Sequence, residues 1–269
     1  MVEETFIIPT EAKAPPKNLF TILSELCALP DSIKPLQFNS LMTAAQYLPI
    51  YRLSRRYAVP GQNALDWGCG NGHFSYFLLR HGLKVQGFSL DPGSNPLQHH
   101  LNDRFGEAYG MTEGDPDNPV QLPYADQSFD LVFSIGVLEH VRETGGSEQA
   151  SLAEIVRVLR PGGYFICGML PKKYSWIEFV VRQVFQGKHQ HAFRYTKRDI
   201  QAMADDAGLA LVDTATHGFL PRNSWNHRWL KPVSNRQFLT QGFNAVDRAL
   251  AWGASPIAQN FLFSARRPA

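Results

Sequence analysis

The stretch Leu65-Asp-Trp-Gly-Cys-Gly-Asn-Gly-His-Phe74 places a glycine at every second position directly after a short apolar run. Glycine adopts positive φ readily and lets a main chain approach another group closely. The apolar run over residues 63–67 predicts a strand, and the helical spacing over 74–80 predicts a helix. The loop between them therefore lies against the phosphates of a dinucleotide, against another adenine-bearing cofactor, or simply forms a tight turn.

The spacing of the glycines disfavours the common phosphate-binding loops. A dinucleotide loop reads G-x-G-x-x-G, but His73 stands where its third glycine belongs, and no G-x-x-x-x-G-K-[ST] pattern is present. Asp66 precedes the first glycine, and its carboxylate would repel a phosphate but attract an ammonium group, directly or through water. The loop therefore suits a zwitterionic or cationic cofactor better than a polyphosphate.

Strand and helix signals alternate along the rest of the chain. Further strands are expected at residues 84–90, 129–135, 164–170, 209–214 and 261–264. Helices are expected at 19–29, 38–57, 147–159 and 196–207, with a helix-compatible polar segment reaching 109–110. Several strands are apolar throughout, which indicates a parallel sheet covered on both faces, with ligands at the carboxyl ends of its strands. The loops after residues 67, 90, 114 and 134 are the candidate site.

Composition limits the class of protein. The 269 residues are 44% hydrophobic and 19% charged with a net charge of +2, which is ordinary for a globular protein and demands no nucleic acid. The cysteines Cys27, Cys69 and Cys167 form no C-x-x-C pair, so neither a zinc knuckle nor a disulfide framework is expected. No signal peptide and no apolar run of about 20 residues is seen. We therefore expect a cytoplasmic monomer or homodimer without membrane insertion.

Further motifs follow the glycine loop in a fixed order, and together they resemble the class I S-adenosylmethionine-dependent methyltransferases. The motifs are the acidic-x-G-x-G-x-G loop and residues 85–91, 113–115, 122–134 with 137–141, 159–164, and 193–200 with 207–208. The resemblance runs from about residue 45 to the last residue of the chain. It implies an α/β, doubly wound, mostly parallel seven-stranded Rossmann-like sheet whose last strand is antiparallel.

The resemblance also implies a site for S-adenosyl-L-methionine, which leaves as S-adenosyl-L-homocysteine. Asp66 and the glycine loop would hold the aminocarboxypropyl end, Asp115 with Pro116 the adenine, and Ser134 with Ile135 would flank the methyl group. The full set of donor-binding candidates is Asp66, Gly68, Cys69, Gly70, Asn71, Gly72, Ser89, Leu90, Asp91, Gly114, Asp115, Pro116, Ser134 and Ile135.

One departure from the family pattern concerns the ribose. The family's ribose carboxylate falls at Ser89 in this chain, and the acid comes two residues later at Asp91. A two-residue offset keeps the facing of a strand residue but moves it by roughly 6 to 7 Å. We expect a bulge that lets Asp91 reach the ribose. The alternatives are that Ser89 makes a weaker neutral contact, or that Asp91 only begins the Asp-Pro-Gly turn.

Two histidines are candidates for chemistry. His140 would lie close to the donor methyl group and could take a proton from a hydroxyl or amine acceptor, or Glu139 and His140 could simply pin the loop. Methyl transfer also proceeds by in-line positioning without an essential base. His189 and His191 could bind a metal, but no nearby Cys or carboxylate completes a shell in the sequence, so no metal is expected and His191 is taken as a substrate contact.

Two aromatic-rich segments exceed what the sheet needs. Residues 1–60 are expected to form an arm and helices over the active site, and residues 61–269 the methyltransferase domain with cap inserts at about 171–195 and 217–259. The inserts would form the acceptor pocket and exclude water. The substrate-binding candidates are Tyr47, Tyr51, His140, Trp176, His191 and Trp225.

The function that the resemblance implies is methyl transfer from S-adenosylmethionine to a small or medium-sized organic acceptor. Methylation on oxygen, nitrogen or carbon is left open. One alternative is a non-catalytic member that keeps the fold as a binding or regulatory subunit. A second is an NAD-dependent oxidoreductase, against which His73 argues.

Overall fold

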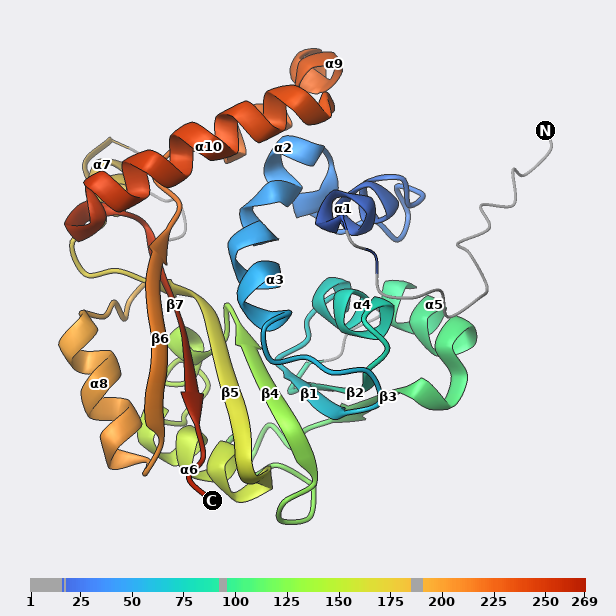
Figure 1. Cartoon of the computed structure of the whole chain (residues 1–269), viewed down its shortest axis with the longest axis vertical. Coiled ribbons are helices and arrows are strands. Elements are labelled where there is room, and N and C mark those ends of the chain that lie inside the picture. The colour runs from blue at the N-terminus through green and yellow to red at the C-terminus, as the bar shows by residue number, and fades with distance from the viewer. Residues whose placement is uncertain (1–15, 17, 92–95, 185–190) are drawn as a thin grey trace.

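The computed structural model describes residues 16, 18–91, 96–184 and 191–269. Its centre is a seven-stranded sheet with the order β3-β2-β1-β4-β5-β7-β6 (Figure 1). The strands are β1 (Asn63–Trp67), β2 (Lys84–Ser89), β3 (Tyr109–Glu113), β4 (Phe129–Ile135), β5 (Leu159–Pro171), β6 (Ala210–His217) and β7 (Asn260–Arg266). β7 runs antiparallel to β5 and β6, and the other neighbouring strands are parallel. The predicted fold class is confirmed.

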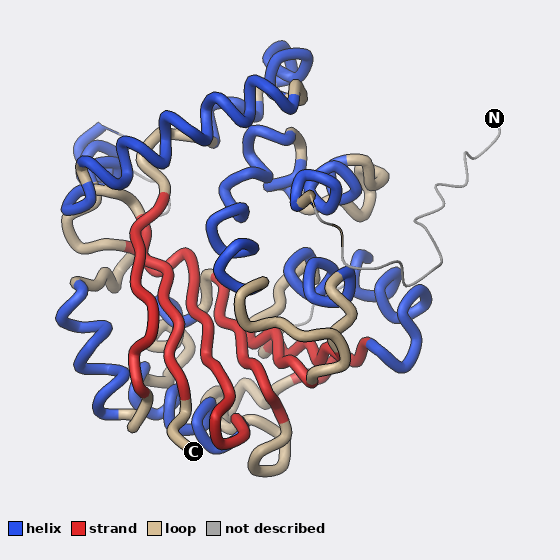
Figure 2. The backbone as a smooth tube through the Cα atoms, in the orientation of Figure 1, coloured by secondary structure: helices blue, strands red, loops and turns tan. Residues whose placement is uncertain are grey.

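Helices cover both faces of the sheet (Figure 2). They are α1 (Leu19–Cys27), α2 (Leu41–Ala44), α3 (Leu48–Ser54), α4 (His73–Arg80), α5 (Pro96–Phe105), α6 (Glu148–Val158), α7 (Trp176–Val184), α8 (Lys197–Asp206), α9 (Lys231–Ser234) and α10 (Gln237–Gly253). Short 3₁₀ turns lie at Leu36–Phe38, Ala45–Tyr47, Gly106–Ala108, Leu138–His140, Asn223–Asn226, Arg228–Leu230 and Ser255–Ile257.

Alternate residues of the central strands pack into two separate hydrophobic clusters. In β4, Leu131 and Phe133 join the side chains of α1, α3, α4 and α5 on one face. Val132, between them, joins those of α6 and α8 on the other. This period of two, with both faces buried, is why β4 reads as a continuous apolar run.

Several boundaries differ by a few residues from the sequence prediction, and three of the differences have a clear local reason. The predicted helix over 38–57 is divided into α2, a 3₁₀ turn and α3, which ends at Ser54. The helix before β3 ends early because Gly106 has φ +50°, so Tyr109 opens a strand instead of extending a helix. β5 begins at Leu159, which pairs with Phe129 ahead of a register shift.

The second predicted insert folds mainly as the helices α9 and α10, between β6 and β7. Asp247 of α10 accepts hydrogen bonds from the main-chain N–H groups of Phe219 (2.8 Å) and Leu220 (2.7 Å) and pairs with Arg222 (2.9 Å). Arg222 also donates to the Met42 carbonyl at 3.1 Å. One buried ion pair thus ties the insert to α2. Within the described part of the chain, no helix combines the length and apolar character needed to cross a bilayer.

The proposed N-terminal arm lies, apart from residues 16 and 18, outside the described residues.

Candidate functional site

The glycine loop sits where β1, β2 and the loop after β4 meet. Gly68, Gly70 and Gly72 all have positive φ, at +72°, +48° and +78°. The N–H groups of Gly68 and Cys69 both donate to the Phe88 carbonyl, at 2.8 and 2.9 Å, and so link the end of β1 to the end of β2. A Cβ on Gly68 would lie 2.4 Å from Cγ2 of Val137. The first glycine is therefore required by packing against the protein itself.

A cavity of about 230 Å³ opens beside this loop, at the carboxyl ends of β1, β2 and β4. This is the edge at which parallel sheets of this kind bind ligands. Six residues that the sequence singles out line it, namely Gly68, Gly70, Ser89, Leu90, Asp91 and His140. Sequence reasoning missed Gly136, Val137 and Pro119, which also line it. Gly136 and Val137 directly follow a predicted strand, and Val137 also opens the motif 137–141, so both carried a signal that was not followed.

Asp66 occupies β1 directly ahead of the loop and is only 2% exposed. Burial raises the pKa of its carboxyl to about 7, while a hydrogen bond from Ser75 Oγ, at 2.6 Å, acts in the opposite direction. A carboxyl in this state gains from an approaching positive charge, because the charge stabilises the ionised form that burial disfavours. Asp66 does not line the cavity itself, but it stands in β1 directly ahead of Trp67 and Gly68, which do, and it supplies a latent negative charge behind the loop.

Ser89 and Asp91 both line the cavity and contact one another. The Ser89 hydroxyl donates to the Asp91 carbonyl at 2.9 Å and accepts from the Asp91 N–H at 3.3 Å. This turn brings the two candidates for the ribose contact to the same wall. Which of them makes that contact stays a prediction.

Other donor-binding candidates lie beside the cavity without lining it. Gly114 donates its N–H to the Ser89 carbonyl at 2.9 Å, and Asp115 Oδ1 accepts from the Asp117 N–H at 2.9 Å. Ser134 is fully buried and stands opposite Cys167 in the β4–β5 register. The remaining candidates outside the lining are Asp66, Cys69, Asn71, Gly72, Pro116 and Ile135. Their roles stay predictions.

A cluster of two histidines and a buried glutamate stands at the rim of the cavity. His140 Nδ1 lies 2.9 Å from Glu143 Oε2, and His191 Nδ1 lies 2.8 Å from Glu178 Oε1. Ligand atoms of Glu139, His140 and His191 all lie within 4.8 Å of one another. The expectation that no carboxylate stands near His191 is therefore wrong, because the fold returns the segment after α7 to the loop after β4. His189 lies outside the described residues.

The electrostatics of this cluster suit proton transfer or cation binding. Burial raises the pKa of Glu139, 3% exposed, to about 7. The hydrogen bond to Glu178 raises the pKa of His191. Groups that titrate near neutrality can accept or pass on a proton. Two imidazoles and a carboxylate are also a ligand set that zinc and other divalent transition metals take, so Glu139, His140 and His191 are the residues that could hold a metal.

The aromatic substrate-binding candidates are engaged in packing. Tyr51 is fully buried and stacks on Phe77 with ring centres 3.9 Å apart, and Tyr47 is 5% exposed. Trp176 Nε1 donates to the Phe219 carbonyl at 2.9 Å, and Trp225 packs edge-on against Phe243. None of the four tyrosines and tryptophans lines the cavity at the glycine loop. Their assignment as acceptor contacts stays a prediction.

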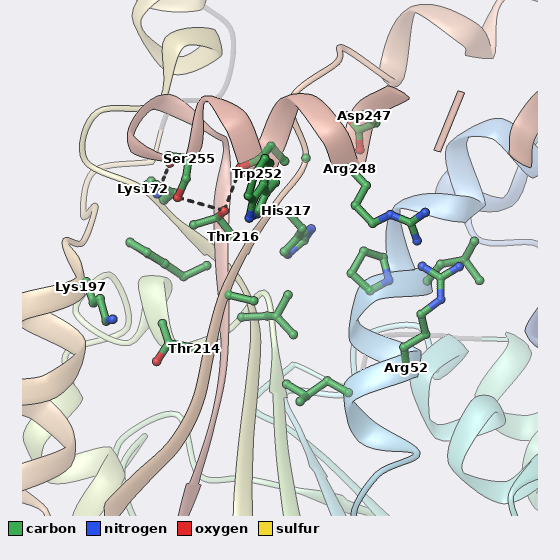
Figure 3. Close-up of a pocket in the computed structure, with 18 of the residues that line it drawn as sticks. Arg52, Lys172, Lys197, Thr214, Thr216, His217, Asp247, Arg248, Trp252 and Ser255 are labelled. Atoms are coloured by element: carbon green, nitrogen blue, oxygen red, sulfur yellow. Dashed lines mark hydrogen bonds between the residues drawn. The ribbon is translucent and has the colours of Figure 1, made fainter. Parts of the chain in front are cut away.

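A second, larger cavity of about 820 Å³ lies between α3, β6 and α10 (Figure 3). Residues from both predicted cap inserts line it together with residues of α2–α3. It shares no lining residue with the cavity at the glycine loop.

Comparison with known proteins identifies relatives of this arrangement. A family model described as a methyltransferase domain matches residues 65–167. A ubiquinone biosynthesis O-methyltransferase of Cereibacter sphaeroides is 30% identical over 175 residues, covering 62% of this chain and 68% of that protein.

Two solved structures share the fold. The 1,6-didemethyltoxoflavin-N1-methyltransferase of Burkholderia thailandensis, with bound 1,6-didemethyltoxoflavin and S-adenosylhomocysteine, matches with a TM-score of 0.52 at 19% identity, over 84% of this chain and 79% of that one. The [4+2]-cyclase SpnF matches with a TM-score of 0.57 at 17% identity, over 85% and 83%.

Proposed function

The chain belongs to the class I S-adenosylmethionine-dependent methyltransferases, and from that premise we infer that the 230 Å³ cavity is the methyl-donor site. The observation that carries this inference is the meeting of the glycine loop and the Ser89–Asp91 turn in the lining of one cavity, with the buried Asp66 directly ahead of the loop. Because these groups offer main-chain, carboxylate and hydroxyl contacts, they fit a ligand with an ammonium group and a ribose.

S-Adenosylmethionine, when bound, supplies an electrophilic methyl group on a positively charged sulfur. The Asp66 carboxyl, shifted to its ionised form by the donor's ammonium, would hold the aminocarboxypropyl end with the glycine loop. Asp91, or Ser89 in its place, would hold the ribose. Gly114, Asp115 and Pro116 would border the adenine, and Ser134 with Ile135 would lie below the methyl group.

We further propose that the acceptor atom is a hydroxyl oxygen. Two observations support this: the name of the Cereibacter relative, which is an O-methyltransferase, and the position of His140 in the lining of the cavity. With Nδ1 hydrogen-bonded to Glu143, the neutral imidazole carries its proton there and has its acceptor at Nε2. His140 would thus take the hydroxyl proton as the methyl group transfers.

We also propose the size of the acceptor, the role of the inserts, the cellular location and the oligomeric state. The acceptor is a small or medium-sized organic molecule, and the inserts at about 171–195 and 217–259 contribute to its binding. The three cysteines are unpaired, which supports a reducing, cytoplasmic location. We propose a monomer or homodimer as the active form.

Calorimetry with S-adenosylhomocysteine, followed by turnover with labelled S-adenosylmethionine and a panel of phenols and amines, tests the proposal. We expect donor binding, methylation of phenols, and a loss of about 10²- to 10⁴-fold in kcat for His140→Gln with an unchanged donor Kd. No donor binding at millimolar concentration contradicts the donor site. Donor binding without transfer to any acceptor favours a non-catalytic member.

Assays with and without EDTA separate two roles of His140. A base acts in either condition, so the natural chain should keep its turnover in EDTA and His140→Gln should be slow both with and without EDTA. If EDTA abolishes turnover and a divalent metal restores it, His140 acts with Glu139 and His191 as a ligand, and the role as base is wrong.

A further inference from the structure

The 820 Å³ cavity between α3, β6 and α10 is strongly asymmetric in charge. Seven of its lining residues are lysines or arginines, and Asp247 is the only carboxylate among the described residues that line it. Asp247 is already engaged by Arg222 and by two main-chain N–H groups. The net charge of the lining is therefore positive, and the described lining residues offer no further carboxylate to neutralise it.

Arg52 of α3 and Arg248 of α10 form the centre of this charge. Figure 3 shows the two guanidinium groups directed toward one another across the cavity. Burial and the positive charge of Arg248 both lower the pKa of Arg52. Among the described residues, no carboxylate is paired with either guanidinium, whereas neighbouring Arg56 is paired with Asp213 at 3.1 Å. Two like charges held together in this way favour an anion between them.

The rest of the wall is largely apolar. Leu53 from α3 and Phe261 and Leu262 from β7 contribute side chains that are buried in the fold and border the cavity. Trp252 of α10 stands at the mouth with 85% of its surface exposed. An indole left in water at the mouth of a cavity offers a flat apolar surface to a ligand.

Two lining side chains carry buried polar atoms that have no hydrogen-bond partner within the described part of the chain. His217 is only 6% exposed, and its Nε2 has no hydrogen-bond partner among the described residues. The same holds for both polar atoms of the Asn244 side chain. Both residues border the cavity, and Figure 3 shows His217 directed toward the space between β6 and α3. Buried polar atoms are rarely left unpaired, so these mark donors and acceptors that the chain itself does not use.

We propose that this cavity binds an amphiphile with a carboxylate or phosphate group on an apolar body. The anionic group lies between Arg52 and Arg248, and the apolar body lies against Leu53, Phe261 and Leu262. Charge complementarity selects the head group, and the apolar wall selects the body. The site shares no lining residue with the proposed donor site, so its occupancy can be measured separately from donor binding.

Calorimetric titration of the full chain with decyl phosphate, decanoate and neutral decyl glucoside, each kept below its micelle concentration, tests the proposal. We expect one anionic probe per chain to bind, and the phosphate and carboxylate arms identify the preferred head group. The glucoside should bind about tenfold or more weakly, because hydrogen bonds to charged groups are the stronger ones.

Three variants assign the binding to these arginines. Arg52→Gln and Arg248→Gln should each weaken the anionic probe about tenfold or more, while Arg52→Lys should retain part of the affinity because it keeps the charge. Arg198→Gln, exposed on α8 outside the cavity, is the matched control and should bind normally. Binding of S-adenosylhomocysteine by each variant checks that the fold is intact.

The proposal is overturned if neither anionic probe binds at millimolar concentration, or if the glucoside binds as tightly as the anionic probes. It is also overturned if Arg198→Gln loses as much affinity as Arg52→Gln and Arg248→Gln. A last contrary result is that the chain binds to anionic vesicles, added in a separate titration, but to neither single anionic probe. The last result would assign the charge to a membrane surface instead of a ligand cavity.

Discussion

Replacing Gly68 by alanine tests the packing beneath the glycine loop. Two separate costs arise. The residue has φ +72°, and a left-handed conformation costs a non-glycine residue about 1 to 2 kcal/mol. The new Cβ would also lie 2.4 and 2.7 Å from the two methyl carbons of Val137, and overpacking of this kind costs about 1 to 3 kcal/mol. We expect Gly68→Ala to lower the free energy of unfolding by about 2 to 5 kcal/mol.

Two further variants separate these costs. Gly61 has φ +88°, but no atom lies within 4 Å of the position that a Cβ would take there. Gly61→Ala should therefore show only the backbone cost of about 1 to 2 kcal/mol. A Val137→Ala background removes the two methyl carbons and leaves only the Cβ of residue 137, at 3.1 Å from the new Cβ. Adding Gly68→Ala there should therefore cost little more than the backbone cost of about 1 to 2 kcal/mol.

Urea denaturation of the four variants and the natural chain measures these differences, with calorimetry against S-adenosylhomocysteine as a second readout. Because Val137 lines the same cavity, Gly68→Ala should weaken this ligand as well. A cost for Gly68→Ala no larger than that for Gly61→Ala would refute the reasoning, as would a cost that Val137→Ala does not reduce.

The same contacts support three other predictions. Burial raises the pKa of Asp66 from 3.8 to about 7, so its contribution to stability is full below pH about 4 and is lost as the pH rises to about 7. Asp66→Asn should therefore remove up to about 4 kcal/mol of the change in the free energy of unfolding between pH 4 and 8, measured by urea denaturation. An unchanged profile would contradict the burial argument. Asp247→Ala leaves Arg222, which is 9% exposed, as a buried charge without its partner carboxylate. The free energy of unfolding should fall by about 3 to 5 kcal/mol. A fall of less than about 1 kcal/mol in the same assay would show that the pair is dispensable. Asp91→Ala should weaken donor binding in calorimetry more than Ser89→Ala does, because an ionised acceptor makes the stronger hydrogen bond, and the reverse order would assign the ribose to Ser89.

The central strands could be predicted from the sequence because burial on both faces leaves a continuous apolar run. β1 and β4 have the predicted bounds. β3 is not recognisable as a strand by its pattern, since it pairs only with β2 at the edge of the sheet and is half-buried. The register between Leu159 and Phe129 is likewise not readable, because glycine and proline in that segment indicate a turn.

In the candidate site, too, residues within one motif could be predicted from the sequence, whereas contacts between distant segments could not. The glycine loop and His140 carry local patterns and line the cavity. The approach of His191 to Glu139 depends on how the chain after α7 returns to the sheet, and no spacing within either segment contains that. Val137 lies inside a quoted motif, but its contact with Gly68 is a packing relation between two loops.

The segment between β6 and β7 begins and ends at neighbouring points of the sheet. His217 and Asn260 are register partners, and the Gln259 N–H donates to the Gly218 carbonyl at 2.7 Å. The strand register and this hydrogen bond therefore hold the two ends of the stretch with α9 and α10 together, while the Asp247–Arg222 pair ties its middle to α2. A variant with another sequence between Gly218 and Gln259 thus keeps a defined pair of anchor points on the sheet, at the opposite side of the strand order from the β1–β2 pair that carries the glycine loop.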